Sequence, residues 1–277
     1  MKNKITHFIG WTRDSSILLS IFFLTIGLII YIWYPLAEEV LSYVDWHGAW
    51  WLYIDWLLIG IFLFMSIAIV TRANLARDSL TIFVAAVGGL AIESWGTQTN
   101  LWHYYTAERP PLWIIPAWPI AALTINRMVG LLSFSNTKHT NVHEEKPFLS
   151  WQAYLRPWQL KTIYWIIFIS FFALMLKFVA PTFDKSYTII SVLLVELLII
   201  SPTDYRLAII TFVAGAGLGY FLELWGTTRE CWTYYTYEKP PLFAVLAHGM
   251  AGVAFWRAEL LMRMFWGRMV LKRNVVK

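Results

Sequence analysis

The chain has 277 residues, of which 58% are hydrophobic and only 14% are charged, and its mean hydropathy is +0.56. Soluble domains carry charge on about a quarter of their residues, so this composition excludes an ordinary soluble protein. The net charge of +5 does not indicate a nucleic-acid partner, because the Lys and Arg residues lie at the ends of apolar segments and in one set of loops.

Apolar segments long enough to cross a bilayer, which takes about 20 residues, recur along the chain. The first is too long for a cleaved signal peptide and lacks a small-residue cleavage pattern after it, so we expect a retained helix. We expect eight transmembrane helices, of which the sixth is the shortest. Their predicted bounds are 16–36, 51–71, 79–97, 112–133, 160–180, 187–202, 207–226 and 242–264.

Basic residues are concentrated in alternate loops. They precede the first helix, follow the eighth, and lie between the second and third and between the fourth and fifth helices. The opposite loops are poorer in Lys and Arg and contain Glu38, Glu39, Asp45 and Asp184. The positive-inside rule therefore predicts that both termini are cytoplasmic. Membrane lipids are the expected surroundings of the chain.

Two segments of the chain are copies of one motif. Residues 93–112 read ESWGTQTNLWHYYTAERPPL and residues 223–242 read ELWGTTRECWTYYTYEKPPL, so that 12 of 20 positions are identical at an offset of 130 residues. This self-similarity predicts an internal repeat. Each unit holds four predicted helices, and an even number brings the second unit back to the side on which the first began.

The repeat defines the predicted architecture. The two units should share one orientation and be related by a pseudo-two-fold axis along the membrane normal. The predicted fold class is all-α and polytopic, with about eight transmembrane helices in two parallel four-helix repeats. The expected divisions are a first unit over 1–134, a cytoplasmic linker over 135–159 and a second unit over 160–277. The repeated motif then lies on the non-cytoplasmic side.

The motif places one carboxylate, Glu93 or Glu223, about one turn inside the outer end of its predicted helix. An ionisable group within a span is costly and usually faces a bundle interior or a wet cavity. Each Glu is either a catalytic proton donor or an acceptor of hydrogen bonds from the loop that follows it. His248 takes the place of Trp118 in the second copy, and it either packs through a hydrogen bond or passes protons beside Glu223.

Aromatic side chains fill much of the motif. They form either an aromatic belt at the membrane interface or a wall for an apolar or polyene ligand near the carboxylates. Gly96 and Gly226 are each expected to end a helix by adopting the left-handed backbone conformation, which other residues resist. The candidate substrate-binding residues are Trp95, Trp102, Tyr104, Trp225, Trp232 and Tyr234.

Several site signatures are missing from the sequence. It contains no Gly-rich phosphate loop, no His pair at metal-ligand spacing and no nucleophile elbow. The single cysteine, Cys231, excludes an intrachain disulfide and a cysteine-based metal cluster. Only His248 lies clearly within a predicted span, so a pair of transmembrane histidines that binds haem is not expected. We predict no metal site and no cofactor.

One pattern occurs in both halves: an intramembrane Glu, then a Gly, then a Tyr in an aromatic cluster. Its residues are Glu93, Gly96 and Tyr104, with Pro116 reopening a helix, in the first half, and Glu223, Gly226 and Tyr234 in the second. The pattern resembles membrane carotenoid-biosynthesis proteins of the carotenoid hydratase type, although the Trp-Gly-Thr and Tyr-Tyr-Thr pieces fall outside the resemblance. The resemblance implies acid-catalysed chemistry on an isoprenoid double bond, with a carboxylic acid that protonates the alkene and aromatic faces that stabilise the cation.

Three functions stay open. The leading one is a membrane-embedded enzyme that acts on an apolar isoprenoid or carotenoid-like substrate, with Glu93 or Glu223 as general acid. The second is a non-catalytic subunit of a larger pigment- or lipid-containing membrane complex, which suits the 17 Trp, 14 Tyr and 18 Phe residues. The third is a proton-coupled transporter with both carboxylates at the repeat interface.

Each of these functions predicts a different interior. An apolar cavity that reaches either carboxylate favours the enzyme. Carboxylates tied to their own loops, without such a cavity, favour the subunit. A wet cavity at the membrane midplane, between the two halves, favours the transporter.

Overall fold

The computed structural model describes residues 10–133 and 155–275, and these residues are mostly helical. Two short strands form the sheet in this part of the chain. The elements are α2 (Arg13–Ile32), α3 (Tyr34–Ser42), η1 (Trp50–Tyr53), α4 (Trp56–Val70), α5 (Leu75–Gln98), β1 (Trp102–Tyr104), η2 (Leu112–Ile114), α6 (Ala117–Ser133), α8 (Pro157–Val179), η4 (Ala180–Thr182), α9 (Ser186–Ile199), α10 (Tyr205–Thr228), β2 (Trp232–Tyr234) and α11 (Leu242–Val275).

Five described segments are long and apolar enough to cross a membrane, and two further apolar helices, α4 and α9, are shorter. This confirms the coarse prediction of an all-α protein with transmembrane helices. α11 is long but does not meet the same criteria of length and apolar composition. The five segments are Arg13–Ile32, Leu75–Gln98, Leu112–Ser133, Pro157–Thr182 and Tyr205–Thr228.

The first predicted helix and the predicted linker both differ from the observed elements. α2 ends at Ile32, and α3 begins at Tyr34 with a proline in its first turn, because Pro35 has no N–H with which to continue the preceding helix. α8 begins at Pro157, inside the interval expected to be linker, which suits the preference of proline for a first helical turn. Most of the linker lies outside the described residues.

Polar side chains set where four of the helices begin. Thr12, Asp55, Asn74 and Asp204 each precede a helix, and each accepts a hydrogen bond from the backbone N–H three residues later, at 2.9–3.3 Å. The first N–H groups of a helix have no partner within it, so such caps stabilise the start. The caps at Asn74 and Asp204 begin α5 and α10, the two helices that carry the motif.

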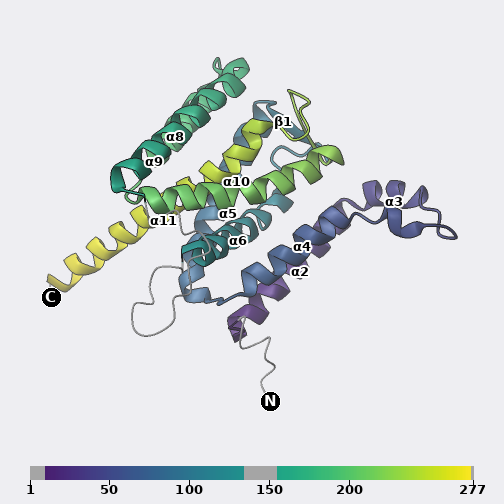
Figure 1. Ribbon diagram of the computed structural model, residues 1–277, viewed down its shortest axis with the longest axis horizontal. Helices are drawn as coiled ribbons and strands as arrows, with labels where there is room; N and C mark the ends of the chain where they lie inside the picture. Colours follow the sequence, from purple (N-terminus) through teal and green to yellow (C-terminus); the bar gives the residue numbers. More distant parts are fainter. Residues whose placement is uncertain (1–9, 134–154, 276–277) are drawn as a thin grey trace.

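Helices α5, α6, α10 and α11 form the centre of the molecule (Figure 1), where α10 packs on α11 and α6, and α5 packs on the same two helices. Helices α8 and α9 flank this centre on one side, and α2 and α4 flank it on the other (Figure 1). α9 contacts α5 and α11, whereas α4 contacts α6 and α10. Each flanking group therefore touches both halves of the chain.

The two copies of the motif meet in the sheet. β1 and β2 are antiparallel, and their register pairs His103 with Thr233, the residue 130 positions later. Trp102 lies opposite Tyr234, and Tyr104 lies opposite Trp232. Equivalent loops thus pair with each other at one end of the central helices, which we call the strand end.

α5 and α10 end in the same way, but not through the predicted glycines. Gly96 and Gly226 both lie inside their helices, so the expectation that they would carry the chain out of the helix was wrong. The left-handed residues are instead Asn100 and Glu230, with φ of 62° and 57°. The carbonyls of the two glycines accept the N–H groups five residues later, at 2.9 and 2.8 Å, which closes each helix end.

Candidate functional site

The first carboxylate, Glu93, is buried in the last turns of α5, with 4% of its surface exposed. Its Oε2 accepts hydrogen bonds from Trp102 Nε1 at 3.0 Å and from the Tyr104 hydroxyl at 2.8 Å. Its Oε1 accepts one from Trp118 Nε1 at 3.1 Å. An indole nitrogen only donates, so Glu93 acts as an acceptor that joins α5, β1 and α6.

The second carboxylate, Glu223, occupies the equivalent place on α10 and is equally buried. Its Oε2 accepts from Trp232 Nε1, and its Oε1 accepts from the Tyr234 hydroxyl, both at 2.9 Å. Its third partner is His248, whose Nε2 lies 3.0 Å from Oε1. An imidazole nitrogen can both give and take a proton. Only the second site therefore contains a partner that readily exchanges a proton with its carboxyl group.

The two tyrosines at these sites act as donors. Burial raises the pKa of the Tyr104 and Tyr234 hydroxyls well above the ordinary value, and the charge of Glu93 beside Tyr104, or of Glu223 beside Tyr234, raises it further. Both hydroxyls therefore stay protonated at physiological pH. Each can hold its carboxylate as a neutral hydrogen-bond donor.

Ring stacking joins the two carboxylate sites into one centre. The rings of Trp118 and His248 lie with centroids 5.7 Å apart and planes 20° apart. Gly89 on α5 and Gly219 on α10 leave room for these rings, since a Cβ at either position would overlap the ring residue beside it. The centre therefore lies where α5, α6, α10 and α11 meet, and it depends on both halves of the chain.

Gly96 and Gly226 provide space for a second pair of rings. A Cβ on Gly96 would overlap the indole of Trp102, and a Cβ on Gly226 would overlap that of Trp232. The absent side chains let each indole lie flat enough against its helix for Nε1 to reach the carboxylate. These two glycines therefore serve the geometry of the site and not the helix ends.

Most of the predicted aromatic residues are buried, which differs from the exposed arrangement of an aromatic belt. The indoles of Trp95 and Trp225 donate to groups other than Glu93 and Glu223: Trp95 Nε1 donates to Thr188 Oγ1 at 3.2 Å, and Trp225 Nε1 donates to Asp55 Oδ2 at 2.8 Å. Both bonds cross between the halves of the chain. Of the six predicted substrate-binding residues, the four that donate to Glu93 or Glu223 are Trp102, Tyr104, Trp232 and Tyr234.

A cavity of about 650 Å³ reaches Glu93, Glu223 and His248. This volume lies within the range of about 300–1,000 Å³ that is usual for ligand sites. Its wall is overwhelmingly apolar, and no Lys or Arg lines it among the described residues. At its edge, Phe83 and Phe265 are 54% and 64% exposed, so the cavity borders the outer surface of the helices.

Comparisons with known proteins assign no family to this arrangement. No protein-family model, curated protein or solved structure matches the chain. Across residues 10–133 and 155–275, no group of three or more His, Cys, Asp or Glu side chains is placed to hold a metal ion. The chemistry of the two carboxylates and of the cavity is therefore the guide to function.

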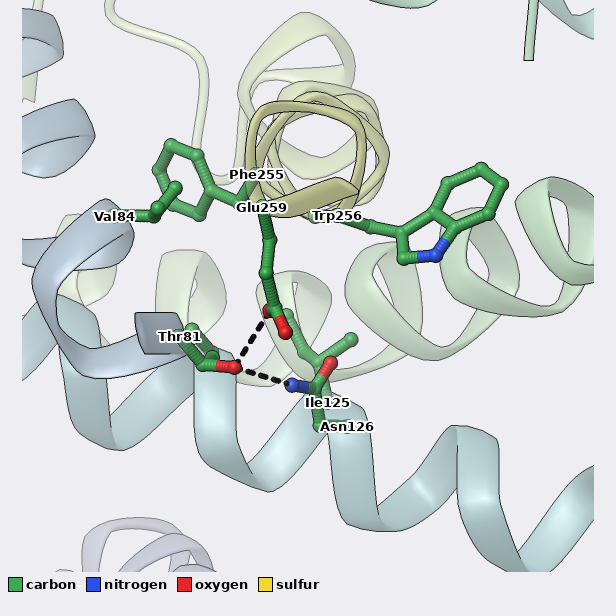
Figure 2. A pocket seen from close by; sticks show the side chains of 9 residues that line it. Thr81, Val84, Ile125, Asn126, Phe255, Trp256 and Glu259 are labelled. Atoms are coloured by element: carbon green, nitrogen blue, oxygen red, sulfur yellow. Dashed lines mark hydrogen bonds between the residues drawn. The ribbon is translucent and has the colours of Figure 1, made fainter. Parts of the chain in front are cut away.

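A second polar cluster lies nearer the start of α5, away from the strand end. Thr81 donates to Glu259 Oε2 at 2.7 Å, and Asn126 donates to Thr81 Oγ1 at 3.3 Å (Figure 2). A pocket of about 10 Å³ beside them is about the size of one water molecule. Nearby along the same helices, Arg127 pairs with the buried Asp78. Sequence reasoning missed this cluster because its members come from distant parts of the chain.

Sequence reasoning also missed two tryptophans on the cavity wall, Trp33 and Trp113. Trp113 follows the Pro-Pro pair of the first motif, and the residue 130 positions later is Phe243. The comparison between halves that singles out His248 at the place of Trp118 would also have found this difference. Nothing local in the sequence singles out Trp33, which lies where α2 gives way to α3.

Proposed function

We propose that the chain is a membrane-embedded enzyme that protonates a carbon–carbon double bond of an apolar isoprenoid substrate. Glu223 is the general acid, and His248 is its proton partner. The observation that carries the proposal is the apolar cavity that leads to this pair. A carboxyl group at the wall of such a cavity can meet an alkene in mostly apolar surroundings.

The reaction begins with transfer of a proton and ends with its return. The proton of the Glu223 carboxyl group bonds to one alkene carbon through the π electron pair, which leaves a carbocation on the other carbon. The aromatic faces beside the carboxylates stabilise that cation. It then loses a proton from an adjacent carbon, or adds water and loses a proton, and His248 returns the released proton to Glu223.

Glu223 is a better general acid than Glu93 because of their third partners. Glu93 meets the indole of Trp118, which offers a hydrogen bond but does not shuttle a proton. Glu223 meets His248, and an imidazole ring can both accept and release a proton. We therefore assign to Glu93 the task of holding the first loop and α6 in place.

A non-catalytic subunit is the second candidate, and one observation favours it. Each carboxylate is bound by the Trp and Tyr of its own loop, as a purely structural role requires. The cavity distinguishes the two candidates, since a subunit has no need of a space that ends at a carboxyl–imidazole pair. The apolar wall of the cavity disfavours a transporter, because a proton-coupled transporter needs a water-filled passage.

We further infer that eight helices cross the membrane, as two parallel four-helix repeats with cytoplasmic termini and with the motif on the opposite side. Three observations support this layout. Equivalent residues pair in β1 and β2, Glu93 and Glu223 each bind the Trp and Tyr at the same places of their own motif, and the loops that are rich in Lys and Arg alternate along the chain. The fifth of these helices is α8, and the eighth is α11.

The first test identifies what the cavity binds. The full chain is purified in a mild detergent, and its organic extract is analysed by mass spectrometry. We expect an isoprenoid in near-stoichiometric amount, enriched over the bulk membrane extract. Recovery of phospholipid alone, together with a stoichiometric partner protein, would contradict the proposal of an enzyme and would favour a non-catalytic subunit.

The second test measures proton transfer. The purified protein and the recovered isoprenoid are incubated in D₂O, and deuterium at carbon is measured by mass spectrometry. We expect E223Q and H248W to lower the rate of incorporation by about 10²-fold or more, because general acid catalysis contributes about 10²–10⁴-fold. H248W places the Trp of the first half in the second, so it can keep a donor to Glu223 without proton exchange.

The matched comparison for that test is E93Q, the same change in the other half. We expect E93Q to lower the rate less than tenfold, with melting temperatures of all variants recorded to detect misfolding. A larger loss in E93Q than in E223Q would contradict the assignment of Glu223. The absence of deuterium at carbon in the wild type would contradict the proposed reaction itself.

A further inference from the structure

Two buried indoles on the cavity wall carry an N–H group without a partner. Trp33 is 7% exposed and Trp113 is 5% exposed, and both line the cavity. Within the described part of the chain, neither Nε1 atom has a hydrogen-bond partner. The two rings meet edge to face, with centroids 5.1 Å apart. Buried donors are almost always paired. Neighbouring side chains cover both Nε1 atoms, so a ligand that supplies the missing acceptor reaches them as the rings turn toward the cavity.

Ring contacts place these indoles beside the carboxylate centre, at the strand end of the cavity. Trp33 stacks on Trp225, with centroids 5.9 Å apart and planes 15° apart. Trp113 meets the ring of Tyr104 edge to face at 5.4 Å, and the hydroxyl of Tyr104 binds Glu93. A ligand that contacts both indoles therefore extends along the apolar wall past the two carboxylates.

The chemistry of the wall narrows the class of ligand. An indole N–H only donates, so the ligand group must be an acceptor. An anionic acceptor such as a phosphate is unsuitable, because no Lys or Arg among the described residues lines the cavity and Glu93 and Glu223 both do. A neutral oxygen satisfies the donors without an uncompensated charge.

We propose that Trp33 and Trp113 form a subsite for a neutral oxygen, as in a hydroxyl, carbonyl or ether group, at one end of an otherwise apolar isoprenoid. The inference rests on the proposed function and narrows its substrate to an oxygen-bearing isoprenoid. Phe243, which takes the place of Trp113 in the second half, also lines the cavity and offers no donor. The subsite therefore sets the direction in which the chain of the ligand lies.

The test compares three probes on the full chain in detergent: geranylgeraniol, the hydrocarbon that lacks its hydroxyl, and geranylgeranyl phosphate. Affinities are measured by competition against tritiated geranylgeraniol. We expect the wild type to prefer the alcohol over the hydrocarbon about five- to tenfold, the effect of one to two modest hydrogen bonds. The phosphate should bind more weakly than the alcohol.

Single substitutions separate the indole N–H groups from the fold. W113F and W33F keep an aromatic ring without the donor, and we expect each to reduce the preference for the alcohol to about two- to threefold. The control is W56F, because Trp56 is 61% exposed, does not line the cavity, and donates to the Trp51 carbonyl. Melting temperatures show which variants are folded, and two independent variants keep the test decisive.

Each remaining outcome contradicts one of the two proposals. Equal affinities for alcohol and hydrocarbon in the wild type, or an undiminished preference in both variants, would overturn the subsite and leave the proton-transfer reaction standing. Tighter binding of the phosphate would overturn the neutral oxygen. An intact preference without deuterium at carbon would retain the subsite and reject the enzyme. Binding of none of the probes would reject the subsite and leave the proton-transfer reaction to the deuterium test.

Discussion

At the scale of the single residue, the site depends on two glycines, because a residue without a side chain leaves room for a neighbouring ring. Gly96 and Gly226 leave the space into which the indoles of Trp102 and Trp232 fit. Each indole N–H reaches its carboxylate only because its ring can lie against the helix. Cores tolerate extra volume poorly, and overpacking a well-packed site costs about 1–3 kcal/mol.

We expect G226A to lower the free energy of unfolding by about 1–3 kcal/mol, because the added Cβ would displace the indole of Trp232 from Glu223. The matched control is G217A on the same helix, where a Cβ would meet no atom within 4 Å. Alanine there should be neutral or should stabilise by up to about 1 kcal/mol. Denaturant unfolding in detergent measures both values, and equal losses in the two variants would contradict this role of Gly226.

At the scale of the element, Asp55 connects α4 to α10. Its Oδ1 caps α4 by accepting the N–H of Leu58 at 3.1 Å. Its Oδ2 accepts from Trp225 Nε1 at 2.8 Å and from Arg229 Nε at 3.1 Å, at the end of α10. Lys185 holds the place 130 residues later, and its Nζ donates to a carbonyl at the end of α5. Both motif helices are therefore tied to the loop before a flanking helix of the other half.

Two substitutions at Asp55 separate the cap from the ion pair. D55N keeps an oxygen for the cap but removes the charge that meets Arg229 and turns a donor toward the Trp225 indole, so we expect a loss of about 1–3 kcal/mol. D55A also removes the cap and should cost about 0.5–2 kcal/mol more. Unfolding free energies in detergent measure both. R229A should add nothing to D55N, and an additive loss would show that the pair does not form.

At the scale of the whole molecule, the proposed topology places the two ends of α5 on opposite sides of the membrane. The single cysteine, Cys231, is 1% exposed, and burial raises the pKa of its thiol to about 12. The reactive thiolate is therefore scarce at neutral pH. The wild-type chain should therefore react little with maleimide, so that labelling of an introduced cysteine shows on which side of the membrane that cysteine lies.

We expect a membrane-impermeant maleimide to label E108C, but not A76C, in intact cells at pH 7. Glu108 follows β1 at the strand end, Ala76 lies in the first turn of α5, and both are exposed. The positive-inside rule, applied to the loops that are rich in Lys and Arg, predicts that the start of α5 lies inside the cell. Both variants should react after lysis, and the wild type should react only after unfolding. Labelling of A76C alone in intact cells would reverse the proposed orientation.

Properties that depend on nearby residues could be predicted from the sequence. Hydropathy over windows of about 20 residues predicted a helical membrane protein, and the structure confirms that coarse class. The match between the motifs singled out Glu93, Glu223 and His248, which the structure brings into one centre. The detailed eight-helix layout and the catalytic roles stay predictions.

Only the tertiary structure decided the features that join distant parts of the chain. The pairing of β1 with β2, the stack of Trp118 on His248, the cavity, and the contact between Trp33 and Trp113 all depend on how the helices pack. The role of Gly96 belongs here too, because its need for space comes from a ring and not from its own backbone. Hydropathy and local spacing act along the chain, whereas these contacts arise from side-chain volumes that meet only once the helices have packed.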